Sequence, residues 1–423
     1  MKLLIKNAKL FYDNNLINCD VLIEDGKFTK IASQISAENA EIIDAKFNLV
    51  APGLVDVHVH FREPGQVHKE TIATGTKASA HGGFTTVGAM PNVIPVPDDV
   101  TKFSQQLALN EKSSIINTLQ YAPVTKEETS DELVDIEALD KLGAFAFSND
   151  GHGIMNAQSM YSAMERIAAI NSHLAAHVED KNLFNKGVIN FGNTSQRLGL
   201  PGIKQAAETS QLARDLVLAK ETGVHYHVCH ISTKDGVELI RMAKDAGINV
   251  TCEVSPHHLL LSEQDILSDN ANFKMNPPLR TESDRLALVS GLSDGTIDMI
   301  ATDHAPHAIN EKNQGFVKSA FGISGIETSF PLMYTNFVKS SQMSLEKLLD
   351  LMSLAPAKIF GIQNTEEIKI GQKADFTIID LDNEFEIKTN DFLSKGANSP
   401  FIGQEVYGQV EKTYVNGNCV FSK

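Results

Sequence analysis

The sequence has few cysteines and no long apolar run, and each absence excludes a class of protein. Its four cysteines are widely scattered and form no CxxC pair, which argues against the dense disulfide framework of small secreted domains. No run of roughly 18 apolar residues occurs, and the opening MKLLIKNAKLFYDNN turns polar before the apolar region of a signal peptide could form. We therefore expect reduced thiols, no membrane partner and a cytoplasmic protein.

Positive charge is also scarce. The chain has 37 Lys and Arg against 53 Asp and Glu, a formal net charge of -16, and this balance opposes general binding to phosphate backbones or anionic lipids. We expect no nucleic-acid partner. The hydrophobic fraction of 42% and charged fraction of 21% lie near the averages of soluble globular proteins, which excludes disorder, collagen-like repeats and coiled coils.

The middle of the chain alternates apolar runs with helical stretches such as 67–81, 205–221 and 234–246. This βαβα pattern is typical of a parallel sheet, and 423 residues leave room for a barrel of about 250 residues plus an appendage. The α/β fold class that we predict is a (β/α)8 TIM-like barrel. A doubly wound open sheet would need fewer strands or a visible edge. The eight apolar runs are 54–59, 85–89, 115–121, 144–147, 174–178, 225–229, 249–254 and 299–301.

Both ends of the sequence read as short β segments with turn signals, among them Asp25-Gly26 and Asn416-Gly417. We predict that residues 1–50 and 362–423 together form one small β-sandwich-like domain. The barrel would then occupy residues 51–361.

A barrel of this kind carries its chemistry at the C-terminal ends of its strands, and polar residues gather at those positions. His58 and His60 end the first run two residues apart, so both imidazoles face one side and can share a divalent metal. A single strand-end histidine is more often solvated or hydrogen-bonded, but the joint pattern favours a metal site. The other strand-end residues of this pattern are Asp150, His177, His230 and Asp303. We expect His225, His227, His257 and His258 to be structural or to lie behind the ligands.

The stretch PGLVDVHVHFREPG, residues 52–65, resembles the cyclic amidohydrolases of the metal-dependent amidohydrolase superfamily. Further along the chain, KMNPPLR at 274–280 and DMIATDHAPH at 298–307 are similar to the dihydroorotase family, in its longer bacterial form (class I). The resemblance extends from about residue 1 to residue 420. It implies a zinc-dependent hydrolase that acts on a cyclic amide.

The resemblance also implies a ligand set for two zinc ions per subunit. His58, His60 and Asp303 would bind one ion, His177 and His230 the other, and Asp150 would bridge both. Many superfamily members bridge their metals with a carboxylated lysine. The fourth strand offers no lysine near Asp150, which suits the branch that uses aspartate.

By the same resemblance, Arg62, Asn92 and His307 hold the carboxylate of dihydroorotate, and His60 also contacts the substrate. An arginine can grip a carboxylate through two parallel hydrogen bonds. Asn276 and the backbone of Phe321-Gly322 would meet the pyrimidine ring. Asp303 would act as general acid and base beside a metal-bound hydroxide. The alternative roles are a surface salt bridge for Arg62, a turn residue for Asn92 and metal ligation alone for Asp303.

The resemblance implies the reversible cyclisation of N-carbamoyl-L-aspartate to L-dihydroorotate in pyrimidine (UMP) biosynthesis. It also implies a homodimer and an association with aspartate transcarbamoylase. One alternative is an allantoinase or dihydropyrimidinase-like hydrolase, although those relatives usually carry the lysine bridge. Another is a catalytically silent scaffold for a partner enzyme, which would be expected to lose ligands. The polar segment 309–320 is predicted to be either a lid over the site or a plain surface loop.

Overall fold

The computed structural model describes residues 2–12, 15–363 and 367–423. At its centre eight parallel strands form a closed ring. Two single bridges complete the ring, one between Ala122 and Phe147 and one between Val59 and His304. The open-sheet alternative is therefore wrong, and the barrel is confirmed. The barrel strands are β6 (Leu54–Val59), β7 (Phe84–Ala89), β8 (Asn117–Gln120), β9 (Phe147–Ser148), β10 (His173–Ala176), β13 (His225–Val228), β14 (Val250–Val254) and β15 (Met299–Ile300).

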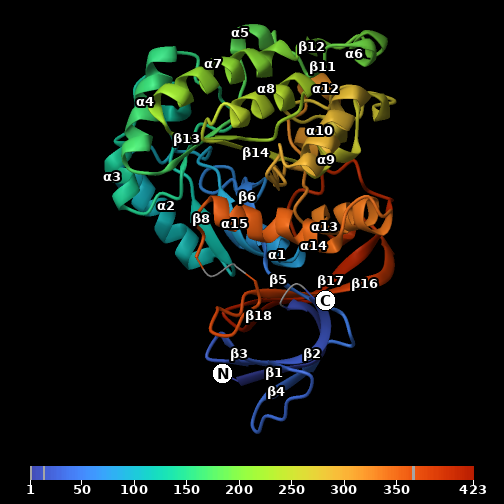
Figure 1. Cartoon of the computed structure of the whole chain (residues 1–423). Helices are drawn as coiled ribbons and strands as arrows, with labels where there is room; N and C mark the ends of the chain where they lie inside the picture. Colours follow the sequence, from blue (N-terminus) through green and yellow to red (C-terminus); the bar gives the residue numbers. More distant parts are fainter. Residues whose placement is uncertain (1, 13–14, 364–366) are drawn as a thin grey trace.

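Helices surround this ring (Figure 1), and apolar side chains from strands and helices share one large core. The helix predicted from residue 67 begins at Ile72, because the Thr71 side chain accepts the Thr74 N–H and forms a capping box. Gly223 ends another helix in the left-handed conformation that glycine favours. The longer helices are α1 (Ile72–His81), α2 (Val100–Ser113), α3 (Ile136–Lys141), α4 (Ala157–Ala169), α7 (Ala206–Thr222), α8 (Lys234–Asp245) and α10 (Glu282–Asp294).

Short helices and strands lie in the loops that connect the barrel strands to the helices, and more short helices follow the last barrel strand. The helices among them are α5 (Lys181–Phe184), α6 (Asn193–Leu198), α9 (Pro256–Leu260), α11 (Ile309–Lys312), α12 (Gly315–Lys318), α13 (Ser329–Met333), α14 (Leu345–Leu349) and α15 (Ala355–Ile359), with π-helical turns at Tyr334–Lys339 and Asp350–Leu354. The 3₁₀ turns are Lys126–Glu128, Glu263–Asp265, Ala271–Phe273 and Thr389–Asp391, and a small parallel pair consists of β11 (Ile189–Asn190) and β12 (Gly202–Ile203).

The two ends of the chain form a second sheet below the barrel (Figure 1). Its two halves join where Val50 lies opposite Ile378 in an antiparallel ladder. The sheet has an apolar cluster of its own, so the predicted sheet from both termini is confirmed. Its strands are β1 (Lys2–Tyr12), β2 (Asn15–Glu24), β3 (Lys27–Ala32), β4 (Glu41–Asp44), β5 (Leu49–Pro52), β16 (Phe376–Glu386), β17 (Glu405–Val415) and β18 (Asn418–Ser422).

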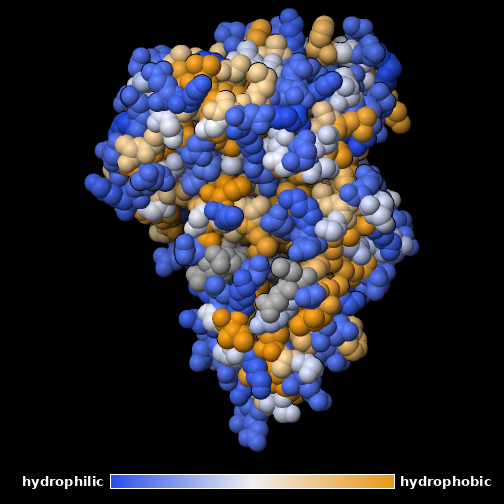
Figure 2. Space-filling view, in the orientation of Figure 1, coloured by the Kyte–Doolittle hydropathy of each residue, from blue (hydrophilic) through white to orange (hydrophobic). Residues whose placement is uncertain are grey.

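The terminal sheet and the barrel are in contact, since β17 packs against α1, α13 and β7. The division of the chain into domains at residues 50 and 361 stays a prediction. Residues 387–404, which connect β16 to β17, run along the barrel and are called the rim strap below. On the face shown in Figure 2, hydrophilic residues are spread over barrel and terminal sheet alike, with hydrophobic residues between them. No helix in the described ranges is long and apolar enough to cross a membrane.

Candidate active site

The strand-end residues singled out in the sequence lie together at one end of the barrel. His58 belongs to β6 and His60 follows it, while the other four lie within three residues of the ends of β9, β10, β13 and β15. All six side chains are buried. They form two groups, each with ligand atoms close enough to share an ion: His58, His60 and Asp303, and Asp150, His177 and His230.

In the first group, the Nε2 atom of His60 lies 3.0 Å from Oδ1 of Asp303 and 3.3 Å from Oδ2 of Asp150. The Nε2 atom of His58 lies 3.3 Å from Oδ1 of Asp150 and 3.5 Å from Oδ1 of Asp303. Ligand atoms about 2.0 to 2.2 Å from a tetrahedral zinc ion are separated by ~3.3 Å. The four side chains therefore have the spacing of a coordination shell.

The second group has similar spacing. Nδ1 of His177 lies 3.0 Å from Nε2 of His230, and the latter atom lies 3.5 Å from Oδ1 of Asp150. The Asp150 carboxylate thus contacts ligand atoms of both groups. One carboxylate between two groups can bridge two cations.

Two buried polar atoms without hydrogen-bond partners indicate that these residues fit a metal ion. Nε2 of His58 and Oδ1 of Asp150 are buried and have no hydrogen-bond partner among the described residues, a state that costs free energy unless something satisfies it. A cation would satisfy both atoms at once. Cys229 lies near the same two side chains, but burial raises the pKa of its thiol, so it is protonated at neutral pH and a poor ligand.

The orientation of His58 depends on Glu253, a residue that the sequence reasoning missed. The Nδ1 atom of His58 lies 2.5 Å from Oε1 of Glu253, and Nε2 of His227 lies 3.1 Å from its other oxygen. A carboxylate on Nδ1 leaves Nε2 free for a metal. Burial alone would raise the pKa of Glu253, but the charge of His58 and the hydrogen bond from His227 lower it. Its place at the end of β14 was the available sequence signal.

Asn92 plays the matching part for His60. Its Oδ1 atom lies 2.9 Å from Nδ1 of His60, so Nε2 of His60 faces Asp150 and Asp303. Because the carbonyl oxygen is engaged, the Asn92 amide N–H groups are the part left for a ligand. The sequence left open that Asn92 is only a turn residue. In the structure its side chain also orients His60.

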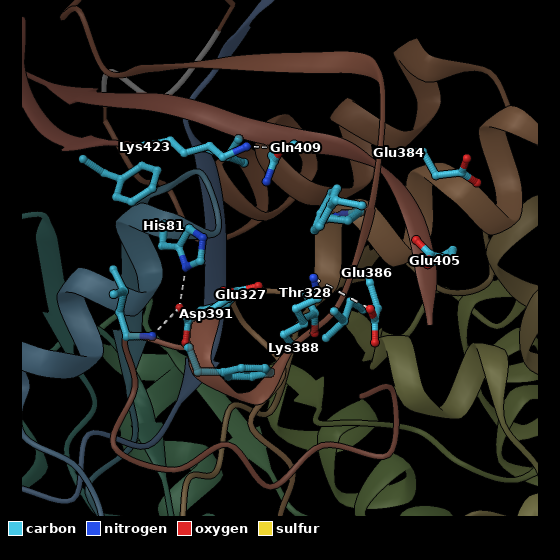
Figure 3. Close-up of a pocket in the computed structure, with 17 residues that line it drawn as sticks. His81, Glu327, Thr328, Glu384, Glu386, Lys388, Asp391, Glu405, Gln409 and Lys423 are labelled. Atoms are coloured by element: carbon cyan, nitrogen blue, oxygen red, sulfur yellow. Dashed lines mark hydrogen bonds and ion pairs between the residues drawn. The ribbon is translucent and has the colours of Figure 1, made fainter. Parts of the chain in front are cut away.

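A cavity of about 170 Å³ opens beside these groups. It is lined by His60, Arg62, Asn92, Asp150, Gly151, His177, Asn276, Asp303, Ala305, Phe321 and Gly322. A larger cavity of about 670 Å³ lies between the terminal sheet and the barrel (Figure 3). We place the chemistry in the smaller one, because the larger holds no cluster of histidines and carboxylates with metal-ligand spacing.

Arg62 is buried at the edge of the smaller cavity, which excludes the surface salt bridge considered from the sequence. Its Nε atom has no hydrogen-bond partner among the described residues. Burial lowers the pKa of Arg62 to about 10, so the guanidinium is still charged at neutral pH. A buried cation that lines a cavity is suited to an anionic ligand.

His307 lies behind the lining residues, with Nε2 3.4 Å from Nη2 of Arg62 and 2.7 Å from the carbonyl oxygen of Phe321. Burial and the charge of Arg62 hold the pKa of His307 far below its usual range. The ring is therefore neutral. Its Nε2–H donates to the carbonyl oxygen of Phe321. This hydrogen bond holds the ring next to the Arg62 guanidinium.

Asn276 and Gly322 also line the cavity. The Asn276 amide nitrogen donates to Glu179 at 2.7 Å, which leaves its carbonyl oxygen as an acceptor for a ligand. Gly322 donates its N–H to Lys274 and accepts from Lys312 at 3.0 Å. Both backbone polar groups of Gly322 are thus engaged within the protein, and its contribution to the cavity is shape.

Segment 309–320 forms α11 and α12 in the wall of the site. The buried Lys312 ammonium donates to the carbonyl oxygens of Lys274, Ala320 and Gly322. The segment is therefore attached at several points to the cavity wall and is not an irregular surface loop.

The chain is similar to known proteins along its whole length. A family model described as Dihydro-orotase-like matches residues 47–236, and one described as Amidohydrolase family matches residues 276–421. The dihydroorotase of Lactobacillus helveticus is 53% identical over 424 residues, which cover 100% of this chain and 99% of that protein. The chain belongs to the dihydroorotase family. Another family member, the dihydroorotase of Ligilactobacillus salivarius, is 53% identical over 426 residues, 100% of this chain and 99% of that protein.

Among solved structures, the L-hydantoinase (dihydropyrimidinase) of Arthrobacter aurescens superimposes with a TM-score of 0.88 at 27% identity, covering 100% of this chain and 96% of that one. Dihydroorotases and hydantoinases thus share the fold. The higher sequence identity lies with the dihydroorotase family.

Proposed function

We propose that this chain is a dihydroorotase that interconverts N-carbamoyl-L-aspartate and L-dihydroorotate reversibly in pyrimidine synthesis. The observation that carries the proposal is the buried Arg62 guanidinium, with an unsatisfied donor, in the same small cavity as the clustered histidines and aspartates. Arg62 would bind an anionic group, and the clustered histidines and aspartates would act on an amide. Because all of them face one small cavity, both groups must belong to one small substrate. Dihydroorotate carries both, whereas hydantoin and allantoin have no carboxylate for Arg62.

The cofactors that we propose are two zinc ions per subunit. His58, His60 and Asp303 would hold one ion, His177 and His230 the other, with the Asp150 carboxylate between them. When bound, such cations activate a water molecule at neutral pH and polarise the amide carbonyl. All six candidate ligands are present and buried, which counts against a catalytically silent scaffold.

Recognition of the substrate would use residues that line the cavity. Arg62 and the amide of Asn92 would bind the carboxylate, with His307 completing this group next to the guanidinium. The free carbonyl oxygen of Asn276 would accept a ring N–H. Phe321 and Gly322 would set the width of the ring site.

Asp303 would carry the proton. During ring opening, water adds to the amide carbonyl, Asp303 accepts its proton, and the proton passes to the ring nitrogen as the C–N bond breaks. Ring closure runs the same steps backwards and releases water. Burial alone would raise the pKa of Asp303, but the hydrogen bond to His60 and the charge of His58 lower it. The carboxylate form that accepts a proton is therefore the resting form.

The direct test follows dihydroorotate ring opening by ultraviolet absorbance, with metal-replete protein, chelator-treated protein and protein reloaded with zinc. We expect activity only in the first and third samples, and much slower turnover of allantoin and hydantoin. Equal rates on either competitor would favour the dihydropyrimidinase-like alternative. Light scattering, alone and with aspartate transcarbamoylase, tests the homodimer and the partner expected from the family.

A further inference from the structure

The rim strap is attached to the barrel through two buried carboxylates. Glu327 accepts the backbone N–H groups of Leu393 at 2.8 Å and Ser394 at 3.1 Å. The same carboxylate faces His81, whose Nδ1 atom lies 2.5 Å away, at the edge of the larger cavity (Figure 3). The Ser394 hydroxyl donates to Glu70, which precedes α1. The strap is thereby held against the barrel just before it reaches the active site.

Asn398 of the strap then enters the wall of the candidate active site. Its Nδ2 atom donates to the carbonyl oxygens of Gly322 at 2.9 Å and Ala305 at 3.2 Å. Its Oδ1 atom accepts the backbone N–H of His307 at 2.9 Å and the hydroxyl of Ser324 at 3.0 Å. A side-chain amide can donate two hydrogen bonds and accept two. The whole capacity of this amide is therefore used, and all of it on two segments of the cavity wall.

The two segments are the ones that contact the cavity from the β15 side. Ala305 and Gly322 line the cavity, and His307 lies against Arg62. They approach each other closely, since a Cβ atom on Gly322 would lie 2.6 Å from the Ala305 carbonyl oxygen. Asn398 spans this contact and fixes the distance between the segments.

The strap backbone approaches the same wall with equal closeness. A Cβ atom on Gly396 would lie 2.7 Å from the backbone nitrogen of His307 and 2.8 Å from its oxygen. Only glycine permits this approach without a shift. Asn398 is 5% exposed, so water does not compete for its four hydrogen bonds.

We propose that Asn398 is a positioning residue for substrate recognition, through which the terminal sheet's strap sets the ring-binding and carboxylate-binding walls of the cavity. The inference rests on the proposed function for its substrate, but the contacts belong to the protein alone. Within the described residues, the Asn398 side chain has its hydrogen bonds with Ala305, His307, Gly322 and Ser324, none of which is a candidate metal ligand. Its loss should therefore change substrate binding without changing metal content.

The first test is Asn398→Asp, with Asn390→Asp as the matched control at an exposed position of the same strap. The aspartate keeps the shape and both acceptor contacts, but it turns a carboxylate oxygen toward the carbonyl oxygens of Gly322 and Ala305. We expect KM for dihydroorotate to rise tenfold or more, kcat to stay within about threefold and metal content to match wild type. The control should leave all three unchanged.

Hydrogen exchange measured by mass spectrometry gives a readout that does not need turnover. In Asn398→Asp the carboxylate oxygen repels the carbonyl oxygens of Gly322 and Ala305 and pushes the two segments apart. Peptides containing residues 305–307 and 322–324 should therefore exchange faster in this variant and not in the control. If wild type failed to turn over dihydroorotate, the proposed function would fail, and this exchange pattern would still decide the positioning role.

Gly396→Ala tests the same inference with Asn398 intact, in case the aspartate variant does not fold. The added methyl group would lie 2.7 Å from both the His307 backbone nitrogen and Oδ1 of Asn398. The strap and the Asn398 amide must then shift from the wall, so the same rise in KM and the same local exchange are expected. Wild-type KM and exchange in either folded variant would overturn the proposal. A lower melting temperature with unchanged KM would show that Asn398 serves stability alone.

Discussion

The imidazole of His58 is fixed from behind by the carboxylate of Glu253, 2.5 Å from its Nδ1 atom. Glu253 in turn accepts from His227, so a buried chain of three side chains leads to the proposed metal site. The same principle recurs at His60 and Asn92. Both histidines of the first strand thus present Nε2 to the aspartates because another residue occupies Nδ1.

Glu253→Gln should weaken metal binding about 10- to 100-fold, because an amide holds the His58 ring less firmly than a carboxylate. Titration against a competing chelator measures the affinity. Glu263→Gln is the control, a buried carboxylate that binds Asn190 away from the ligands. Unchanged zinc affinity in Glu253→Gln would show that the contact does not orient the ligand.

Asp150→Ala should lower the metal content from two ions toward one per chain. A bridging carboxylate offsets the repulsion between two close cations, and Oδ1 of Asp150 lies near ligand atoms of both groups. Elemental analysis of the dialysed protein gives the count. Two ions retained in this variant would place the bridge elsewhere.

Arg62→Lys should reduce kcat/KM for dihydroorotate about ten- to hundredfold, since the lysine keeps the charge but loses the two-pronged geometry. That loss corresponds to about 1.5 to 3 kcal/mol for hydrogen bonds to a charged group. Metal content should be unchanged. Normal kinetics in this variant and in Arg62→Met would make Arg62 a structural residue.

The Arg62→Met variant has a further expected result. A buried charge without a paired partner costs free energy, so its removal should leave the melting temperature of the ligand-free protein equal to or above that of wild type. Differential scanning calorimetry measures this. A clear fall in melting temperature would mean that the guanidinium stabilises the fold.

The reactivity of the four cysteine thiols tests whether the protein core is packed as described. Cys419 is exposed, whereas Cys19, Cys229 and Cys252 are buried, and burial with the charge of Asp20 raises the pKa of Cys19 to about 11. A thiol-reactive dye at pH 8 should label one cysteine quickly in the native protein and all four after unfolding. Rapid labelling of more than one would contradict the described packing.

The barrel and the candidate ligands could be predicted because each has a local signal. Apolar runs alternate with helices, and histidines such as His58 and His60 stand directly at strand ends. Glu253 also stands at a strand end, but its partner His58 is far away in the sequence, and Asn398 has no local signal of this kind. Only closure of the barrel brings Glu253 to His58, and only the docked strap brings Asn398 to His307.

Strand lengths show a second limit of sequence patterns. The apolar run Leu3–Ile5 is only part of β1, which extends from Lys2 to Tyr12 and also buries Ala8 and Leu10. The strand pairs with β2 across an irregularity in register between Ile5 and Ala8. Backbone pairing therefore extends the strand beyond its continuous apolar run.

The junction of β5 with β16 also bears on how a growing polypeptide reaches its working form. Every candidate metal ligand is synthesised before the rim strap. β5 can pair with β16 only after β16 has been synthesised, late in translation. A nascent chain halted after Asp303 would carry the full ligand set, yet it would lack one wall of the cavity. We expect such a chain to capture metal before it can recognise its substrate, so metal loading and substrate recognition would be acquired in that order during synthesis.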